Sequence, residues 1–300
     1  MLLALSVSLL LQAPSSALVV GYPGVDENID YASVHPLRAP MLESVGQLGN
    51  QRRGSAVYLG SSWILTANHA FEARTSDVAI FAGKEYQLGV GRAVRLRNPD
   101  ASGAAGTSDL VMVPMLTSPD LPALKISEQT PFAGELVVMV GCGERAIRPG
   151  SGVILTDSKD LPQPLVRPIS DDGTQADGED GPLWGENEIA GRGIRLGLPG
   201  KVGETRAFVT IRQPFWTPHN AQGAAGDSGG GVFVKRGKQW QLAGVMLGVI
   251  HREDLNASGT FIGDLSVYRE QIESTIPEPS AALLLLSAAG MLALRRRRRP

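Results

Sequence analysis

Residues 55–70 read SAVYLGSSWILTANHA and contain two short β-forming runs, the second followed by a histidine. The first run covers residues 55–59, the second covers residues 63–67, and GSS lies between them. Short runs rich in β-branched and aromatic residues on both sides of a Gly-containing turn are typical of a β-hairpin. The sequence therefore predicts a hairpin that ends just before His69.

The rest of the chain repeats this pattern of short apolar runs separated by Gly, Pro, Asn and Ser. Many short strands with frequent turns favour an all-β barrel or sandwich. Helical periodicity is clear only over residues 264–272, where Leu265, Tyr268 and Ile272 fall on one face. Further strands are predicted at residues 78–82, 86–96, 110–115, 135–140, 152–156, 207–211, 231–235 and 240–250.

The N-terminal end differs from this body. Residues 1–17 are apolar, and Ser15 and Ala17 suit the positions before a signal-peptidase cleavage site, although no Lys or Arg precedes the apolar run. We expect a signal peptide at residues 1–17, and a buried first strand is the alternative.

The C-terminal segment, residues 277–300, contains Pro-Glu-Pro, an uncharged stretch at 281–294 and five arginines at 295–299. The uncharged stretch is shorter than the roughly 20 residues of a usual membrane span, and by length alone it fits a buried core helix. The arginines instead suit the cytoplasmic edge of a membrane. The order of the three parts resembles the PEP-CTERM sorting tail. This resemblance implies a short transmembrane segment, processing by an exosortase-type enzyme, and export to the cell surface, the extracellular matrix or the medium.

Charge and cysteine content limit the classes of partner. The tail holds five of the 28 Lys and Arg residues and one of the 30 Asp and Glu residues, and residues 1–17 hold none, so residues 18–276 have a formal net charge of −6. A nucleic-acid partner is not expected, because a phosphate binder needs a basic face. Cys142 is the single cysteine, so no intrachain disulfide can form. The acidic stretch 171–180 lacks the EF-hand pattern, which favours a solvated loop over a calcium site.

Residues 224–231 read AAGDSGGG and place Asp227 and Ser228 inside a run of glycines. A flexible surface loop is one interpretation. The other is a tight turn that presents the Ser228 hydroxyl as a nucleophile, with glycines where a Cβ would forbid the backbone angles. Such a serine needs a base and a third group that orients the base.

Three stretches together identify candidates for these roles. LTANH ends at His69, DLVM begins at Asp109, and GDSGG surrounds Ser228. This order along an all-β chain resembles the trypsin/chymotrypsin-like serine proteases over about residues 53–275. The resemblance implies two six-stranded antiparallel β-barrels, about residues 18–135 and 136–276, a short C-terminal helix, and an active site between the barrels.

The resemblance also implies a role for each matching residue. Ser228 would be the nucleophile, His69 the general base and later the general acid, and Asp109 the group that orients the imidazole and stabilises the imidazolium. The backbone N–H groups of Gly226 and Ser228 would form the oxyanion hole. Asp227 would pair with a newly made N-terminal amine. The resemblance implies no cofactor and no metal, and a protein or peptide as substrate.

The predicted substrate pocket departs from the family pattern. Its base aligns with Gln222, where an Asp would favour Arg or Lys as the P1 residue of the substrate. Its wall aligns with Leu247, Gly248 and Val249, where most members have Ser-Trp-Gly. Val249 in place of Gly would narrow the pocket. We therefore expect a preference for small or apolar P1 side chains and no specificity for Arg or Lys.

Other departures concern cysteines and the mature N-terminus. Ala70 and Ala224 stand where most members have cysteines, so the usual disulfides are absent. Val19-Val20-Gly21 resembles the first residues of the mature family members, and cleavage after Ala17 would leave one residue before it. We expect that export itself exposes the activating N-terminus.

One rival nucleophile motif is excluded. GDSGG also matches the G-x-S-x-G turn of α/β-hydrolases, which place an acid and then a His after the Ser. No Asp or Glu lies between Ser228 and His251. The predicted function is an exported serine endopeptidase. A non-catalytic surface binding protein or matrix component that retains the fold is the alternative.

Overall fold

The structure is a computed structural model of the chain. It describes residues 19–20, 42–51, 53–100, 106–143, 182–198, 203–212, 221–223, 226–252 and 257–276. The predicted signal peptide, the strand at 152–156, the acidic stretch 171–180 and the C-terminal tail lie outside these residues. Within the ranges given, no helix has the length and apolar character that a membrane crossing requires.

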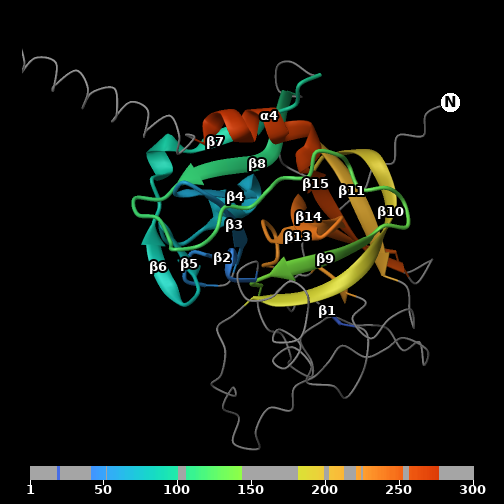
Figure 1. Cartoon of the computed structure of the whole chain (residues 1–300), viewed down its shortest axis with the longest axis horizontal. Coiled ribbons are helices and arrows are strands. Elements are labelled where there is room, and N and C mark those ends of the chain that lie inside the picture. The colour runs from blue at the N-terminus through green and yellow to red at the C-terminus, as the bar shows by residue number, and fades with distance from the viewer. Residues whose placement is uncertain are drawn as a thin grey trace, which may run out of the picture.

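The N-terminal half is an antiparallel sheet of seven strands (Figure 1). They are β2 (Val45–Leu48), β3 (Ser55–Gly60), β4 (Trp63–Ala67), β5 (Val78–Phe81), β6 (Lys84–Gln87), β7 (Val94–Arg97) and β8 (Thr107–Pro114), in the order β6-β5-β2-β3-β4-β8-β7. The Leu116 N–H donates to the Gln87 carbonyl at 2.9 Å, and the Gly89 N–H donates to the Pro114 carbonyl at 2.7 Å. These bonds join the end of β6 to the end of β8, so six strands close into a barrel and β7 is added beside β8.

The C-terminal half is a closed barrel in the order β10-β11-β15-β14-β13-β9 (Figure 1). Its strands are β9 (Leu136–Gly141), β10 (Leu183–Leu196), β11 (Thr205–Arg212), β13 (Gly231–Arg236), β14 (Gln239–Arg252) and β15 (Ala257–Asp264). All neighbouring strands are antiparallel. The predicted architecture of two six-stranded antiparallel barrels is therefore confirmed.

The hairpin and the closing helix form where the sequence predicts them. β3 pairs with β4 through Val57 and Leu65, and Ser61 and Ser62 make the turn with positive φ angles of 50° and 65°. Helix α4 (Leu265–Thr275) packs on β7 and β14, with Leu265, Tyr268 and Ile272 buried as the periodicity predicted. Its N-terminus is capped because the Asp264 carboxylate accepts the Ser266 N–H at 3.1 Å.

The structure differs from the sequence prediction in several details, and strands β2 and β15 are among the elements that were not predicted. The predicted strand 86–96 is divided into β6 and β7 by the 3₁₀ turn Val90–Arg92, which lies in a stretch with glycines at positions 89 and 91. Strand β10 was not predicted, because its glycines and charged residues interrupt the apolar alternation. Helix α3 (Asn68–Ala73), which follows β4 directly, is too short for its periodicity to be recognised.

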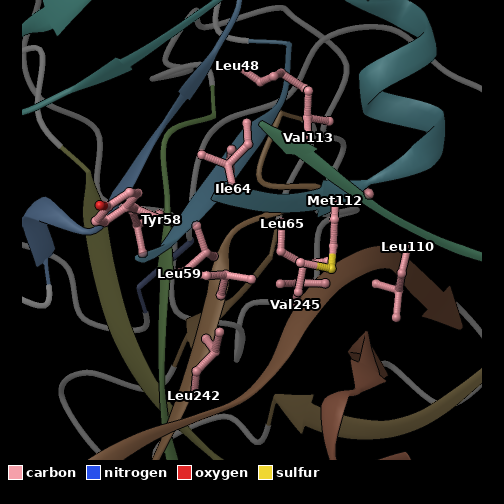
Figure 2. Close-up of a cluster of buried hydrophobic side chains, with 14 of the residues drawn as sticks. Leu48, Tyr58, Leu59, Ile64, Leu65, Leu110, Met112, Val113, Leu242 and Val245 are labelled. Atoms are coloured by element: carbon pink, nitrogen blue, oxygen red, sulfur yellow. The ribbon is translucent and has the colours of Figure 1, made fainter. Parts of the chain in front are cut away.

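A continuous hydrophobic core joins the two halves. Figure 2 shows Leu65 and Met112 of the N-terminal half beside Val245 of β14, with Leu242 below them. All four side chains are fully buried. Because the barrels share this core, side chains on one half can be held in place by backbone groups of the other.

Candidate active site

His69 and Asp109 form a pair at the edge of the N-terminal barrel. His69 lies in the first turn of α3, and Asp109 lies in β8, the strand paired with β4. His69 Nδ1 is 2.6 Å from Asp109 Oδ2, and the His69 backbone N–H donates to Asp109 Oδ1 at 2.9 Å. The carboxylate is buried, whereas the imidazole is 25% exposed. Because Nδ1 faces the carboxylate, Nε2 is the ring nitrogen left for proton transfer.

Thr205, the first residue of β11, holds Asp109 from the other barrel. The Asp109 backbone N–H donates to Thr205 Oγ1 at 2.7 Å, and both residues are buried. The position of the aspartate is therefore fixed from both halves of the molecule. The sequence analysis missed Thr205, since no local pattern marks a contact between residues 96 positions apart.

A polar network anchors the start of β11 next to Thr205. The Tyr268 hydroxyl of α4 donates to Asn98 Oδ1 at 2.5 Å and accepts the Arg206 N–H at 2.9 Å. Asn98 Nδ2 donates to the Glu204 carbonyl at 2.6 Å. Burial raises the pKa of Tyr268 to about 12, so the hydroxyl stays neutral and keeps its proton for Asn98.

Ser228 lies in a turn, residues 226–230, whose geometry requires glycine. Gly226 and Gly229 have φ angles of 88° and 91°, which residues with a side chain rarely adopt. A Cβ at Gly229 would lie 2.1 Å from the Ser55 carbonyl oxygen. The Gly230 N–H donates to the Asp227 carbonyl at 2.8 Å, which fixes the peptide that carries the Ser228 N–H.

The turn rests against the hairpin that leads to His69. The Ser55 N–H donates to the Ser228 carbonyl at 2.8 Å, and Thr66, three residues before His69, donates its hydroxyl to the Ser55 carbonyl at 2.6 Å. Ser228 is partly exposed. Over the described ranges, no hydrogen bond joins its hydroxyl to the His69 ring, and the N–H groups of Gly226 and Ser228 have no acceptor.

Asp227 points into the C-terminal half. It is buried, and its Oδ1 accepts the Gly143 N–H at 3.1 Å. Strand β1 (Val19–Val20), in the segment predicted as the mature N-terminus, pairs with β12 (Ala221–Gln222), which precedes Asp227 in the chain.

The predicted pocket residues are divided between two strands around Thr260. Gln222 ends β12, and the next N–H, of Gly223, donates to Thr260 Oγ1 at 2.8 Å. Val249 of β14 lies opposite Thr260 in the barrel. Gly248 and Val249 are partly exposed, but Leu247 is buried in the hydrophobic core shared by the two halves. The structure thus places Leu247 in the core, whereas Val249 and the residue after Gln222 each adjoin Thr260.

Other histidines and metal ligands are the remaining groups that could take part in chemistry at the site. His35 and His219 lie outside the described residues. In the described part of the chain, no group of three or more His, Cys, Asp or Glu side chains is arranged to hold a metal ion.

Comparisons with known proteins concern the C-terminal tail and the fold. A family model described as the PEP-CTERM protein-sorting motif matches residues 275–299, and no curated protein matches the chain. Among solved structures, mouse neuropsin, a serine protease, is 14% identical with a TM-score of 0.50, covering 80% of this chain and 97% of that chain. The MamO protease domain from Magnetospirillum magneticum is 12% identical with a TM-score of 0.46, covering 80% and 98%. The Rv3671c protease from M. tuberculosis is 15% identical with a TM-score of 0.46, covering 89% and 93%.

At such identities the likeness concerns the fold alone, and the sorting motif is independent of it. The chain therefore has the two-barrel fold of the trypsin-like serine proteases and ends in the sorting motif of proteins exported to the cell envelope or surface.

Proposed function

We propose that this chain is an exported serine endopeptidase that hydrolyses peptide bonds through an acyl-enzyme intermediate. The contact between His69 and Asp109, beside a glycine turn that presents Ser228, is the observation that carries the proposal. A buried carboxylate that holds Nδ1 leaves the imidazole oriented to accept a proton at Nε2.

In the proposed reaction, the Ser228 hydroxyl attacks the carbonyl carbon of the substrate while His69 Nε2 takes its proton. His69 then donates this proton to the leaving amine, and Asp109 stabilises the imidazolium that forms in between. In the second half of the reaction, His69 takes a proton from water as the water attacks the acyl-enzyme, and His69 then returns the proton to the Ser228 oxygen as the acid product leaves. Hydrogen bonds between nucleophile and base are often long in unliganded enzymes and shorten when substrate binds.

The N–H groups of Gly226 and Ser228 are suited to stabilise the tetrahedral intermediate. Neither has an acceptor within the described ranges, so both can donate to a developing oxyanion. Removing one such donor typically costs roughly 10²–10³-fold in kcat. No cofactor or metal takes part in this scheme.

The substrate is proposed to be a protein or peptide with a small or apolar P1 residue. Gln222 carries no charge to attract Arg or Lys, and Val249, which pairs with Thr260 across the barrel, would narrow the pocket. Cleavage of a peptide library would measure this preference. A strong preference for Arg or Lys would contradict it.

The proposed maturation uses both ends of the chain. Removal of residues 1–17 would free an amine near Val19, and the pairing of β1 with β12 supports its proposed ion pair with Asp227. An exosortase-type enzyme would process the tail, residues 277–300, after it has engaged the membrane. N-terminal sequencing of the exported protein tests the first step, and a start well beyond Gly21 would contradict it.

A fluorophosphonate probe tests the proposed nucleophile directly. The full-length chain and its Ser228→Ala variant are treated with the probe, and hydrolysis of unfolded casein is followed in parallel. We expect labelling and hydrolysis by the parent alone. If the folded parent is unreactive, the same assay on a chain that begins at Val19 distinguishes an uncleaved precursor from a non-catalytic protein.

A further inference from the structure

The buried hydroxyl of Ser55 contacts two segments that the proposed chemistry depends on. Ser55 Oγ donates to the Gly226 carbonyl at 2.9 Å and accepts the Cys142 N–H at 2.9 Å. Ser55 is fully buried, and its bond to the Cys142 N–H is shielded from water. The side chain thus links the first residue of the Ser228 turn to the end of β9.

The backbone of Ser55 adds two further bonds. Its N–H holds the Ser228 carbonyl, and its carbonyl accepts the Thr66 hydroxyl of the strand that leads to His69. The three polar groups of this one residue, its N–H, its carbonyl and its hydroxyl, therefore make four hydrogen bonds near the boundary between the halves. Three of the four partners lie outside the hairpin of Ser55 itself: Gly226, Ser228 and Cys142.

We propose that the Ser55 side chain is a positioning residue that sets the conformation of the 226–230 turn. By orienting the Gly226 carbonyl, Ser55 Oγ holds the peptide between Gly226 and Asp227. This peptide connects the two peptides that carry the Gly226 and Ser228 N–H groups, so its orientation limits the directions in which they point. The expected effect of Ser55 on the reaction rate rests on the proposed function. The structural part of the inference, the ordering of the turn, stands apart from any activity.

The test compares Ser55→Ala with Ser127→Ala in the full-length chain. Ser127 is also buried and donates its hydroxyl to a backbone carbonyl, that of Gln129, but it lies outside the site. Ser55→Ala removes only the two side-chain bonds and keeps the backbone bonds to Ser228 and Thr66. A misplacement of the reacting groups by about 1 Å can cost about 10²-fold in rate. We therefore expect kcat and the rate of fluorophosphonate labelling to fall at least about tenfold, with KM nearly unchanged, and Ser127→Ala to react like the parent.

Amide hydrogen exchange gives the readout that does not need activity. Peptides covering residues 226–231 and 139–143 should exchange faster in Ser55→Ala than in Ser127→Ala. If the parent and the chain that begins at Val19 are both unreactive, the proposed function fails, while hydrogen exchange still decides the structural role of Ser55. If amide exchange in Ser55→Ala is the same as in the parent, the inference is wrong. It is also wrong if exchange is faster but Ser55→Ala is labelled by the fluorophosphonate at the rate of a reactive parent. Restoration of both readouts by Ser55→Thr, which keeps the hydroxyl, would support it.

Discussion

At the scale of single residues, the candidate site depends on how Asp109 is held. Its carboxylate binds the ring and backbone of His69, and its own N–H is held by Thr205. Asp109→Asn should leave the fold intact and lower kcat by about 10⁴-fold, because the amide favours the wrong imidazole tautomer. Steady-state kinetics together with a thermal melt separate this effect from unfolding, and a variant with parental kcat would show that Asp109 has no catalytic role.

Thr205→Val should act on stability and on rate together. It leaves the buried Asp109 N–H without an acceptor, which costs about 1–3 kcal/mol in the free energy of unfolding. The displaced aspartate should also lower kcat. Thr205→Ser, which keeps the hydroxyl, is the matched control in urea denaturation and kinetics. If the two variants had the same free energy of unfolding and the same kcat, the Thr205 hydroxyl would not be needed to hold Asp109.

Gly229 tolerates no side chain. A Cβ there would meet the Ser55 carbonyl oxygen at 2.1 Å and Thr66 Oγ1 at 2.3 Å, in a backbone with a φ of 91°. Gly229→Ala should therefore destabilise the protein by more than about 4 kcal/mol. Gly237 also has a positive φ, 59°, but has open space around its Cβ position, so Gly237→Ala should cost only about 1 kcal/mol. Chemical denaturation of both measures the difference.

A residue of the site could be predicted from the sequence only where its immediate neighbours in the chain mark it. The glycines around Ser228 and the aspartate before an apolar strand are visible within a few residues, so the elements of the site could be named. Ser55 and Thr205 could not, because their partners lie 171 and 96 positions away and become neighbours only when the barrels close. Leu247 and Val249 would share a face of a regular strand. The irregularity in β14 between Met246 and Gly248 changes this, and the sequence does not reveal it.

At the scale of elements, Tyr268 fastens α4 to both halves. Burial raises its pKa to about 12, against about 10 in the unfolded chain. The unfolded state therefore loses its proton first, and the stabilisation by Tyr268 is complete below pH 10 and lost as the pH rises to 12. The stability difference between the parent and Tyr268→Phe should shrink by about 2 kcal/mol over this range.

Urea denaturation of parent and Tyr268→Phe at pH 8, 10 and 12 measures this difference. The variant should be less stable at pH 8, since Asn98 Oδ1 and the Arg206 N–H lose their partner. A constant difference across the three pH values would contradict the raised pKa. Tyr86→Phe controls for general effects of high pH, because Tyr86 is partly exposed and lies in β6, away from this network.

Elements with strong periodicity could be predicted from the sequence, and those without it could not. The hairpin and α4 have regular apolar spacing, and both form as expected. β10 contains glycines and charged residues along its length, and only its second half is mostly exposed or partly exposed. Its position is therefore decided by pairing with β9 and β11 and not by its own composition. Tertiary pairing commonly overrides local strand preference in this way.

At the scale of the whole molecule, the folded body and the sorting tail should be separable. The last buried side chain of α4 is Ile272, and the helix ends where the Ile276 N–H donates to the Ile272 carbonyl at 3.2 Å. A chain that ends at Ile276 should therefore keep its melting temperature and its labelling at Ser228. Cell fractionation should show that it no longer reaches the location of the full-length protein, because the tail carries the sorting motif.

A chain that ends at Asp264 is the matched control for this truncation. It lacks Leu265, Tyr268 and Ile272, whose burial contributes roughly 1.5–3 kcal/mol per large apolar side chain. Their combined loss is comparable to the whole stability of a typical domain, about 5–15 kcal/mol, so this chain should not fold. If the longer chain also failed to fold, or if it were sorted like the full-length protein, residues 277–300 would not be the independent tail that the motif predicts.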